Sequence, residues 1–407
     1  MLGSLLWRRP AAVAWLFLSA SLLAACGSSN TESPSQPQAA TPPPEAVQPP
    51  AQVTQPTPPT PSLPAAAKIK VALLLPLSGP NASFGGGMLD AAQMALFDVA
   101  DDRLELAPQD TKGTPEGAAD AARAALTDGA KLILGPLLAA EVEAVKPLAQ
   151  AANVPVLAFS TSTQLAGDGT WLIGFLPKAE VDRVVDFAHA KGASRFAVLA
   201  PRTPYGEITV AAMRDAAQRD GASLAQIGFF DPAAPDLTQT VKKFAAANSG
   251  MDALLLPEGG TRLKTLAPLL PYYKIEPDKV HFLGTGLWDE PGMGTEPALV
   301  GGWYAAPAPG ARADFEKRFN DVYHRAPPRL ATLAYDATAL AAVLAHSGAG
   351  DFSVAAITNP SGFAGVDGIF RLLPDGLVQR GLAVIEVRKD GDTVIDPAPD
   401  TFQPTTQ

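Results

Sequence analysis

The chain has 407 residues, of which 47% are hydrophobic and 18% are charged, and its formal net charge is −10. A folded part of this size exceeds what one hydrophobic core usually serves, so two lobes are expected. The acidic balance argues against nucleic acid as a partner, because no excess of lysine and arginine is available to neutralise phosphates.

The beginning of the chain, residues 1–25, has the pattern of a signal peptide. Arg8 and Arg9 form a basic start, and residues 11–20 are apolar, uncharged and too short to span a bilayer comfortably. Small residues then precede Cys26, and this LAAC sequence resembles the lipobox of bacterial lipoproteins. We therefore expect Cys26 to be lipidated and to become the first residue of the mature protein. An ordinary secretory signal with a chance cysteine is the alternative.

The segment that follows the leader reads as a tether to a membrane. Cys26 is the only cysteine, which rules out a disulfide, a catalytic thiolate and a cysteine-based metal site in the folded part. Gly27 replaces the aspartate that holds such lipoproteins at the inner membrane, so we expect a periplasmic protein anchored at the outer membrane. Residues 26–67 are rich in proline and too poor in apolar surface to pack, which predicts a disordered tether.

From Lys68 onward, apolar runs alternate with helical patterns. Strands are expected at 69–75, 104–107, 131–134 and 154–159, and helices at about 86–100, 114–127 and 139–152. Thr114 and Pro115 are typical of a helix start, as a cap and a first-turn proline. Short connections between these units favour parallel strands with right-handed crossovers.

The same alternation restarts after residue 174. Strands are expected at 195–200, 223–230, 252–256, 280–283 and 302–307, and helices at about 181–188, 206–220, 236–248, 262–270, 311–324 and 331–346. Near the end, residues 365–372 and 382–387 are predicted to form a ribbon around the turn at 374–376. We expect the last two helices to return to the first lobe and these two strands to the second.

Four consecutive hydroxyl residues, 160–163, follow the apolar run that ends at Phe159. Ligands of open α/β sheets bind just beyond the carboxyl ends of strands, and hydroxyl groups offer donors and acceptors to a small polar solute. An ordinary strand-to-loop transition is the alternative, since Ser and Thr favour turns.

Several short stretches carry a family resemblance through their order and spacing. They are KIKVALLLPLSG at 68–79, GPL at 135–137, VPVLAFSTS at 154–162, PYG at 204–206 and LAYDA at 333–337. In this the chain resembles the type I periplasmic solute-binding proteins of the leucine/isoleucine/valine-binding family. The resemblance implies an α/β fold of two Rossmann-like, doubly wound lobes with a ligand cleft between them.

The resemblance also implies how the chain divides. Three crossings between the lobes are expected near Phe175, Ala306 and Pro360. Lobe 1 would take residues 68–175 and about 306–360, lobe 2 would take 176–305 and about 361–396, and residues 397–407 would form a tail.

A second set of stretches resembles the bacterial lipoproteins called penicillin-binding protein activators, which reuse this fold. These are GTGLW at 284–288, GGWYAAP at 301–307 and PPRLATLAYD at 327–336. This resemblance implies a regulator of peptidoglycan synthesis that docks on a cell-wall synthase. The alternative is the amino-acid or small-solute-binding component of an ABC transporter, which works with an ABC permease.

On the lobe 1 side, the resemblance places five residues at the ligand. They are Ser78, Gly79, Ser160, Thr161 and Ser162. Hydroxyl and backbone N–H groups in these loops would hold a ligand carboxylate, because several aligned donors offset its desolvation. For Ser78 and Gly79 a plain turn before proline is the alternative.

On the lobe 2 side, the resemblance points to Tyr205, Glu258, Thr285 and Trp288. Tyr205 would cover an apolar part of the ligand and Glu258 would receive an ammonium group, unless Glu258 is a solvated loop acid. Trp288 would fill the cleft or pack at the hinge. Family members that bind amino acids carry an acid in this later loop, and whether Asp289 takes that place is open, which weakens a leucine-type specificity.

Catalytic patterns are missing from the sequence. The four histidines, His189, His281, His324 and His346, are scattered without metal-ligand spacing. The chain contains no G-x-S-x-G, P-loop, G-x-G-x-x-G or H-E-x-x-H motif. We therefore expect a binding protein and not an enzyme, with no metal and no cofactor.

Overall fold

The computed structural model describes residues 68–99, 103–247, 250–346 and 350–402. All of these residues belong to the compact unit Pro64–Gln407. The expected signal peptide, Cys26 and the proline-rich tether lie outside the described residues, and so does the end of the expected tail, 403–407.

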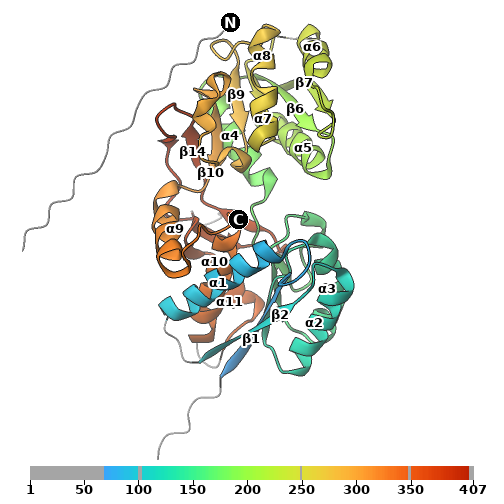
Figure 1. Cartoon of the computed structure of the whole chain (residues 1–407), viewed down its shortest axis with the longest axis vertical. Coiled ribbons are helices and arrows are strands. Elements are labelled where there is room, and N and C mark those ends of the chain that lie inside the picture. Colours follow the sequence, from blue (N-terminus) through green and yellow to red (C-terminus); the bar gives the residue numbers. More distant parts are fainter. Residues whose placement is uncertain (1–67, 100–102, 248–249, 347–349, 403–407) are drawn as a thin grey trace, which may run out of the picture. The chain divides into compact units, whose positions relative to one another are not determined.

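The first sheet contains five parallel strands in the order β2-β1-β3-β4-β5 (Figure 1). Its elements are β1 (Ile69–Leu75), α1 (Ala82–Val99), β2 (Leu104–Asp110), α2 (Pro115–Thr127), β3 (Leu132–Leu134), α3 (Ala139–Ala151), β4 (Val156–Ala158), the 3-10 turn η1 (Thr163–Leu165) and β5 (Thr170–Leu172). Residues 71–75 of β1 have no exposed surface, because both faces of this sheet are covered. As expected, Thr114 caps α2 by accepting a hydrogen bond from Gly117 N.

The second sheet contains seven strands in the order β15-β14-β10-β9-β8-β6-β7. Its elements are α4 (Pro177–Ala190), β6 (Arg195–Pro201), α5 (Pro204–Arg219), β7 (Ser223–Phe230), α6 (Thr238–Ala246), β8 (Ala253–Leu255), α7 (Gly260–Leu266), α8 (Leu269–Tyr272), β9 (His281–Gly284), η2 (Gly286–Trp288), η3 (Met293–Thr295), η4 (Pro297–Leu299), β10 (Trp303–Ala306), β14 (Ala383–Glu386) and β15 (Thr393–Asp396). Strands β6 to β10 are parallel, and β14 and β15 add an antiparallel edge.

The end of the chain departs from the predicted pattern in one strand. Its elements are α9 (Pro309–Tyr323), α10 (Ala331–His346), α11 (Val354–Ile357) and a small antiparallel sheet of β11 (Phe363–Gly365), β12 (Gly368–Leu372) and β13 (Val378–Arg380). β12 pairs with β13 around the turn at 374–376, whereas β14 pairs with β10 of the second sheet. The ribbon predicted between 365–372 and 382–387 is therefore wrong in its second strand.

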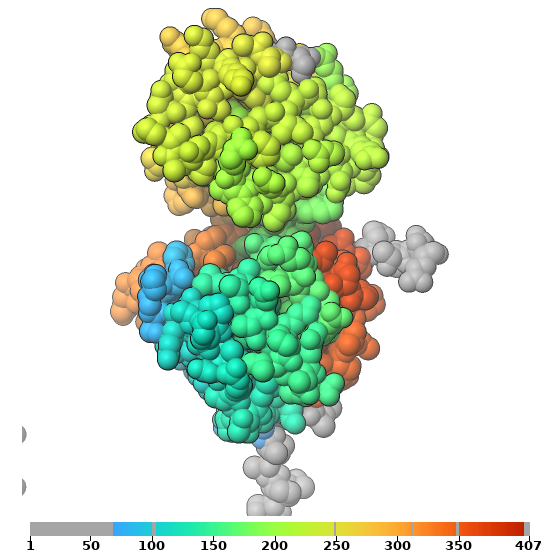
Figure 2. Space-filling view, turned by 90° about the vertical axis from the view of Figure 1, so that its right-hand side faces the viewer, coloured from blue at the N-terminus to red at the C-terminus, as the bar shows by residue number. Residues whose placement is uncertain are grey.

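Hydrophobic packing separates the elements into two lobes. Leu340 of α10, Phe370 of β12 and Val378 of β13 share one hydrophobic cluster with β1 to β5, so we call this group, with α1–α3 and α9–α11, lobe 1. The second sheet with α4–α8 has clusters of its own and is lobe 2. In Figure 2 the red C-terminal segments lie beside the teal elements of lobe 1. The expected two-lobe α/β fold is confirmed.

The third crossing between the lobes is the connection from β13 to β14, at residues 381–382, and not near Pro360 as expected. The small sheet stays with lobe 1 because two hydrogen bonds tie its turn to β5. Trp171 Nε1 donates to Leu373 O at 3.0 Å, and Leu172 N donates to Gly376 O at 2.8 Å. Both bonds join residues that are distant in sequence, so no local sequence pattern predicts them.

Replacing Gly376 by alanine should loosen this attachment. Gly376 has a φ of +87°, and a Cβ there would lie 2.2 Å from Gly167 N. Backbone strain and overpacking together predict a loss of about 2 kcal/mol or more in the free energy of unfolding, measured in urea.

The control is Gly310→Ala in the first turn of α9, where a Cβ would meet no atom within 4 Å. This variant should match or slightly exceed the wild-type stability. Equal unfolding midpoints for the two variants would contradict the tight packing inferred at Gly376.

Candidate functional site

The hydroxyl residues after β4 lie where the sequence placed them, at the carboxyl end of a parallel strand. Ser160 is 5% exposed, and its Oγ accepts a hydrogen bond from Ser162 N at 3.2 Å. Thr161 is exposed and Ser162 is half-buried. The Ser160 hydroxyl is thus tied into its own loop, while Thr161 and Ser162 present polar groups at the surface of lobe 1.

Ser78 and Gly79 follow β1 and lie beside Asp110, which was not among the predicted site residues. Asp110 Oδ1 accepts hydrogen bonds from Leu77 N at 2.9 Å, Ser78 N at 3.2 Å and Lys112 N at 2.8 Å. Desolvation opposes the ionisation of Asp110, but the hydrogen bonds from Ser78, Lys112 and Leu77 outweigh it and lower its pKa. The amide of Ser78, which was expected to hold a ligand carboxylate, therefore already holds a carboxylate of the protein.

The proximity of Asp110 to this loop follows from strand register. Leu75, the last residue of β1, lies opposite Asp110, the last residue of β2. The predicted strand at 104–107 ends three residues too early, so Asp110 was left out of the set of strand-end residues. A strand prediction that reached residue 110 would have placed Asp110 at the strand end, next to the loop after β1.

In lobe 2, three of the four predicted residues lie together. The Tyr205 hydroxyl and Thr285 Oγ1 are 2.8 Å apart and share a hydrogen bond. Thr285 is fully buried, and Tyr205 is half-buried at the start of α5. Burial raises the pKa of Tyr205, and the nearby charges of Glu180 and Glu258 raise it further. Tyr205 is thus held neutral, with its ring fixed at the carboxyl end of the sheet.

Glu258 follows β8 and is half-buried. Burial raises the pKa of its carboxyl group, against the opposing effects of the Gly259 N–H and of Arg262. Such a carboxylate gains from a cation that replaces the lost water. A ligand ammonium group is a cation of this kind.

Trp288 lies in the core of lobe 2 and has no exposed surface. Its Nε1 donates a hydrogen bond to Leu256 O at 3.1 Å, and its ring packs against Gly284 and Gly302. Of the two interpretations of Trp288, packing is correct, although within the lobe and not at the hinge. This corrects the expectation that its side chain contacts a ligand.

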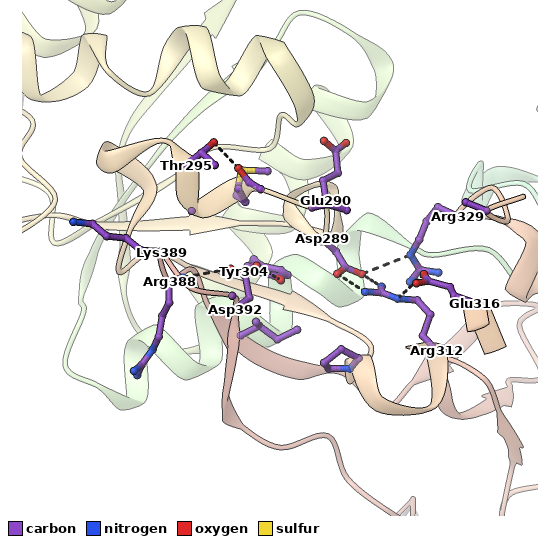
Figure 3. Close-up of a pocket in the computed structure, with 18 of the residues that line it drawn as sticks. Asp289, Glu290, Thr295, Tyr304, Arg312, Glu316, Arg329, Arg388, Lys389 and Asp392 are labelled. Carbon is purple, nitrogen blue, oxygen red and sulfur yellow. Dashed lines mark hydrogen bonds and ion pairs between the residues drawn. The ribbon is translucent and has the colours of Figure 1, made fainter. Parts of the chain in front are cut away.

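Asp289 is occupied by two arginines and is not free to receive an ammonium group. Its carboxylate forms a two-pronged ion pair with Arg312 of α9, with 2.8 Å between Nη2 and Oδ1, and lies 3.6 Å from Arg329 Nε (Figure 3). The three side chains lie at one end of a cavity of about 680 Å³. None of the nine predicted ligand residues lines this cavity.

A second group of charges is buried where the chain crosses between the lobes. Glu180 of α4 is 6% exposed, and burial raises its pKa to about 7, although the Gly286 N–H and two arginines favour its ionised form. Asp336 is 2% exposed, and burial likewise raises its pKa to about 7. Asp336 Oδ1 accepts a hydrogen bond from Val366 N at 2.8 Å, so this carboxyl group is engaged within the fold.

Neither Glu180 nor Arg380 can be recognised from local sequence, because each looks like a surface residue of its own helix or strand. Glu180 stands in the first turn of a helix, where acids are common for local reasons. Arg380 ends a three-residue strand. Their burial arises only when the crossing segments bring the two elements together.

The described part of the chain offers neither a metal site nor a membrane-spanning helix. In the residues that the structure describes, no three His, Cys, Asp or Glu side chains are grouped so that they can hold a metal ion. Within the same residues, no helix has the length and apolar character needed to cross a membrane.

Glu180→Gln should change how stability depends on pH. Since the folded-state pKa of about 7 exceeds the ordinary value of 4.5, the folded protein keeps a proton that the unfolded chain releases. The free energy of unfolding therefore falls as pH rises from about 4.5 to about 7. The variant should be more stable than the wild type at pH 8, by at most ~3 kcal/mol at 1.36 kcal/mol per pKa unit. Urea unfolding at pH 4.5, 6 and 8 measures this.

Glu207→Gln is the matched control, because Glu207 also stands in the first turn of a helix but is exposed. Its stability curve should run parallel to that of the wild type. If the Glu180→Gln curve also runs parallel to the wild type, the inferred titration of Glu180 is wrong.

Residues 68–392 match the model of a family described as periplasmic binding protein. The chain is similar in structure to an ABC transporter substrate-binding protein from Sphaerobacter thermophilus, with 20% identity, a TM-score of 0.70, and coverage of 82% of this chain and 98% of that chain. It is similar also to a putative branched-chain amino acid ABC transporter protein from Rhodospirillum rubrum, with 19% identity, a TM-score of 0.70, and coverage of 81% and 100%. At these identities the likeness establishes the fold alone.

A curated relative, an uncharacterized protein of Rickettsia prowazekii, is 24% identical over 224 residues, or 54% of this chain. The matched part spans little more than half, 56%, of that relative. The family model, in contrast, covers most of the chain and includes every strand of lobe 1 and all but the end of lobe 2. The chain belongs to the periplasmic binding protein family.

Proposed function

We propose that the protein captures a small polar solute of the amino-acid type between its lobes and serves as the solute-binding component of an ABC transporter. The observation that carries this proposal is the hydrogen-bonded pair of Tyr205 and Thr285 beside the half-buried carboxyl group of Glu258. These groups follow three neighbouring elements at the carboxyl edge of one sheet, where open α/β sheets bind ligands.

Each group has a role that its surroundings support. An ammonium group of the solute would hold Glu258 ionised and offset its desolvation. Tyr205 would cover the apolar part of the solute, since its hydroxyl is already bonded to Thr285. On lobe 1 the free polar groups of Thr161 and Ser162 would hold a carboxylate.

Ser78 and Gly79 remain proposed contacts, although Asp110 already accepts hydrogen bonds from the amide groups of Leu77 and Ser78. Ser160 remains a proposed contact through its backbone carbonyl group, since its hydroxyl group already accepts a hydrogen bond from Ser162 N. An acid on lobe 2 and hydroxyl groups on lobe 1 favour a zwitterionic solute, with its ammonium group toward Glu258 and its carboxylate toward residues 160–162.

The placement in the cell belongs to the same proposal. The leader predicts export to the periplasm, and lipidation of Cys26 would anchor the protein, with residues 26–67 as the tether. We propose an anchor in the outer membrane and an ABC permease as the partner. The relatives with an informative description are binding proteins, so we propose binding without catalysis and without a cofactor.

Thermal unfolding of the full chain with a panel of amino acids and related solutes tests this function. A solute at a hundred times its Kd should stabilise the protein by ~2.7 kcal/mol and raise the Tm by several degrees. Glu258→Gln and Tyr205→Phe should weaken this shift, and the Glu207→Gln control should keep it. A panel in which no solute raises the Tm would sink the transport proposal.

A second function, activation of a penicillin-binding protein, is favoured by two features of the solute site. Trp288 is withdrawn into the core, and Asp110 fills the amide loop after β1. Both features suit a protein that keeps the family fold but works through its outer surface, as the stretches at 284–288, 301–307 and 327–336 imply. In this case a cell-wall synthase is the partner and peptidoglycan synthesis is the regulated process.

Purified full-length protein added to a bifunctional cell-wall synthase of the same cell distinguishes the two functions. The activator function predicts co-purification and a several-fold rise in glycan polymerisation or cross-linking. Boiled protein is the control for effects of the buffer. An unchanged synthase rate together with no co-purification would remove this function.

A further inference from the structure

Glu180 connects the first crossing of the chain to the loop that carries Thr285. It lies in the first turn of α4, shortly after Phe175, and its Oε2 accepts a hydrogen bond from Gly286 N at 3.0 Å. A Cβ at position 286 would lie 2.7 Å from Glu180 Oε1, so glycine is needed for this approach. The adjacent Thr285 is the residue that shares a hydrogen bond with the Tyr205 hydroxyl. Glu180 is thus one contact away from the wall of the solute site.

Arg380 lies on the other side of the crossing, at the end of β13 in lobe 1. It is 8% exposed, and its Nη2 donates a hydrogen bond to Ile173 O at 2.6 Å. Its guanidinium group lies over the rings of Phe175 and Phe370, at 4.9 and 5.3 Å. Its Nε and Nη1 are buried and have no hydrogen-bond partner. Buried N–H groups without an acceptor are costly, so this arginine has two donors to offer.

Glu180 and Arg380 line the same small cavity. Its volume of about 10 Å³ is enough for roughly one water molecule. The remaining walls are apolar and are formed by Phe175, Leu176, Ala179, Val378 and Leu382. Glu180 of lobe 2 and Arg380 of lobe 1 therefore border one water-sized space.

Other charged groups surround this pair. Those that act on Glu180 are Arg329 and Asp289, and those that act on Arg380 are Asp367, Asp336 and Arg329. The Tyr205 hydroxyl also lies near Glu180. Arg329 is engaged by Asp289 at 3.6 Å and by Asp367 at 3.1 Å. Asp367 and Asp336 act on Arg380 more strongly than Glu180 does, but two N–H groups of Arg380 remain without an acceptor.

We propose that Glu180 and Arg380 are positioning residues for the solute site: their attraction across the hinge sets the place of the loop 285–288 and, through Thr285, that of Tyr205. The proposal rests on the proposed solute-binding function. As the lobes approach, the unused N–H groups of Arg380 meet the carboxylate of Glu180 and the small cavity closes. Movement at the hinge is thereby coupled to the positions of Thr285 and Tyr205 in the solute site.

Distances between the lobes test the coupling without any ligand. The full chain with Cys26→Ser has no native cysteine, so spin labels can be placed at Glu143→Cys on α3 and Arg214→Cys on α5, both exposed positions. Pulsed electron paramagnetic resonance should show a distance distribution that shifts between pH 5.5 and 8.5. The shift should be lost in Glu180→Gln and Arg380→Met and kept in Arg380→Lys.

Amide hydrogen exchange at fixed pH gives a second measurement. Residues 285–288 should exchange several-fold faster in Arg380→Met than in the wild type, because the attraction that holds Glu180 in place is gone. Arg371→Met is the control, since Arg371 is 7% exposed in the same small sheet but does not line the cavity. It should change neither the distances nor the exchange of residues 285–288.

The results of these experiments can contradict the coupling of Glu180 and Arg380 without contradicting the solute-binding function, and the reverse. A wild-type distance distribution that does not respond to pH, or a response that persists in Glu180→Gln, would overturn the coupling. A normal response without stabilisation by any solute would leave the coupling intact and remove the transport function. Far-ultraviolet circular dichroism of each variant confirms that it is folded.

Discussion

Two guanidinium groups lie over the ring of Phe175, that of Arg329 at 4.4 Å and that of Arg380 at 4.9 Å. Phe175 belongs to the first crossing between the lobes, and both arginines belong to lobe 1. Each arginine faces acids from the other side of the crossing, Asp289 and Glu180. Burying such charges is costly, and the attraction between opposite charges offsets only part of that cost. The relation between the lobes therefore depends on this balance of charge.

Two successive hydrogen bonds connect these charges to the proposed solute site. Glu180 holds Gly286, and the preceding Thr285 bonds the hydroxyl of Tyr205. On the opposite lobe, Asp110 organises the loop after β1 in a comparable way. Both walls thus consist of loops whose backbone N–H groups are satisfied by acids of the protein. This leaves Glu258, Tyr205 and the hydroxyl groups of Thr161 and Ser162 as the side chains that can contact a solute.

Local pattern was enough for most of the fold and for part of the site. Continuous apolar runs such as 71–75 predicted parallel strands, because a strand covered on both faces has no polar side. The same logic placed Ser160, Tyr205, Glu258 and Thr285 after strand ends. It failed for Trp288, because an aromatic residue in a loop looks the same whether it faces a ligand or fills a core. It also failed for residues 378–387, where two short apolar runs follow one turn and either can pair with β12.

By itself, the sequence determined the alternating α/β plan and the two-lobe division, since these follow from chain length and from periodicity within single elements. Tertiary structure alone decided which strand pairs with β12, that Asp110 occupies the amide loop, and that Glu180 and Arg380 meet at one cavity. The physical reason is that burial of a charge and the pairing of a strand depend on partners distant in the chain. Glu180 and Arg380 carry no local mark of burial, because the environment that makes them matter forms only when the lobes are joined.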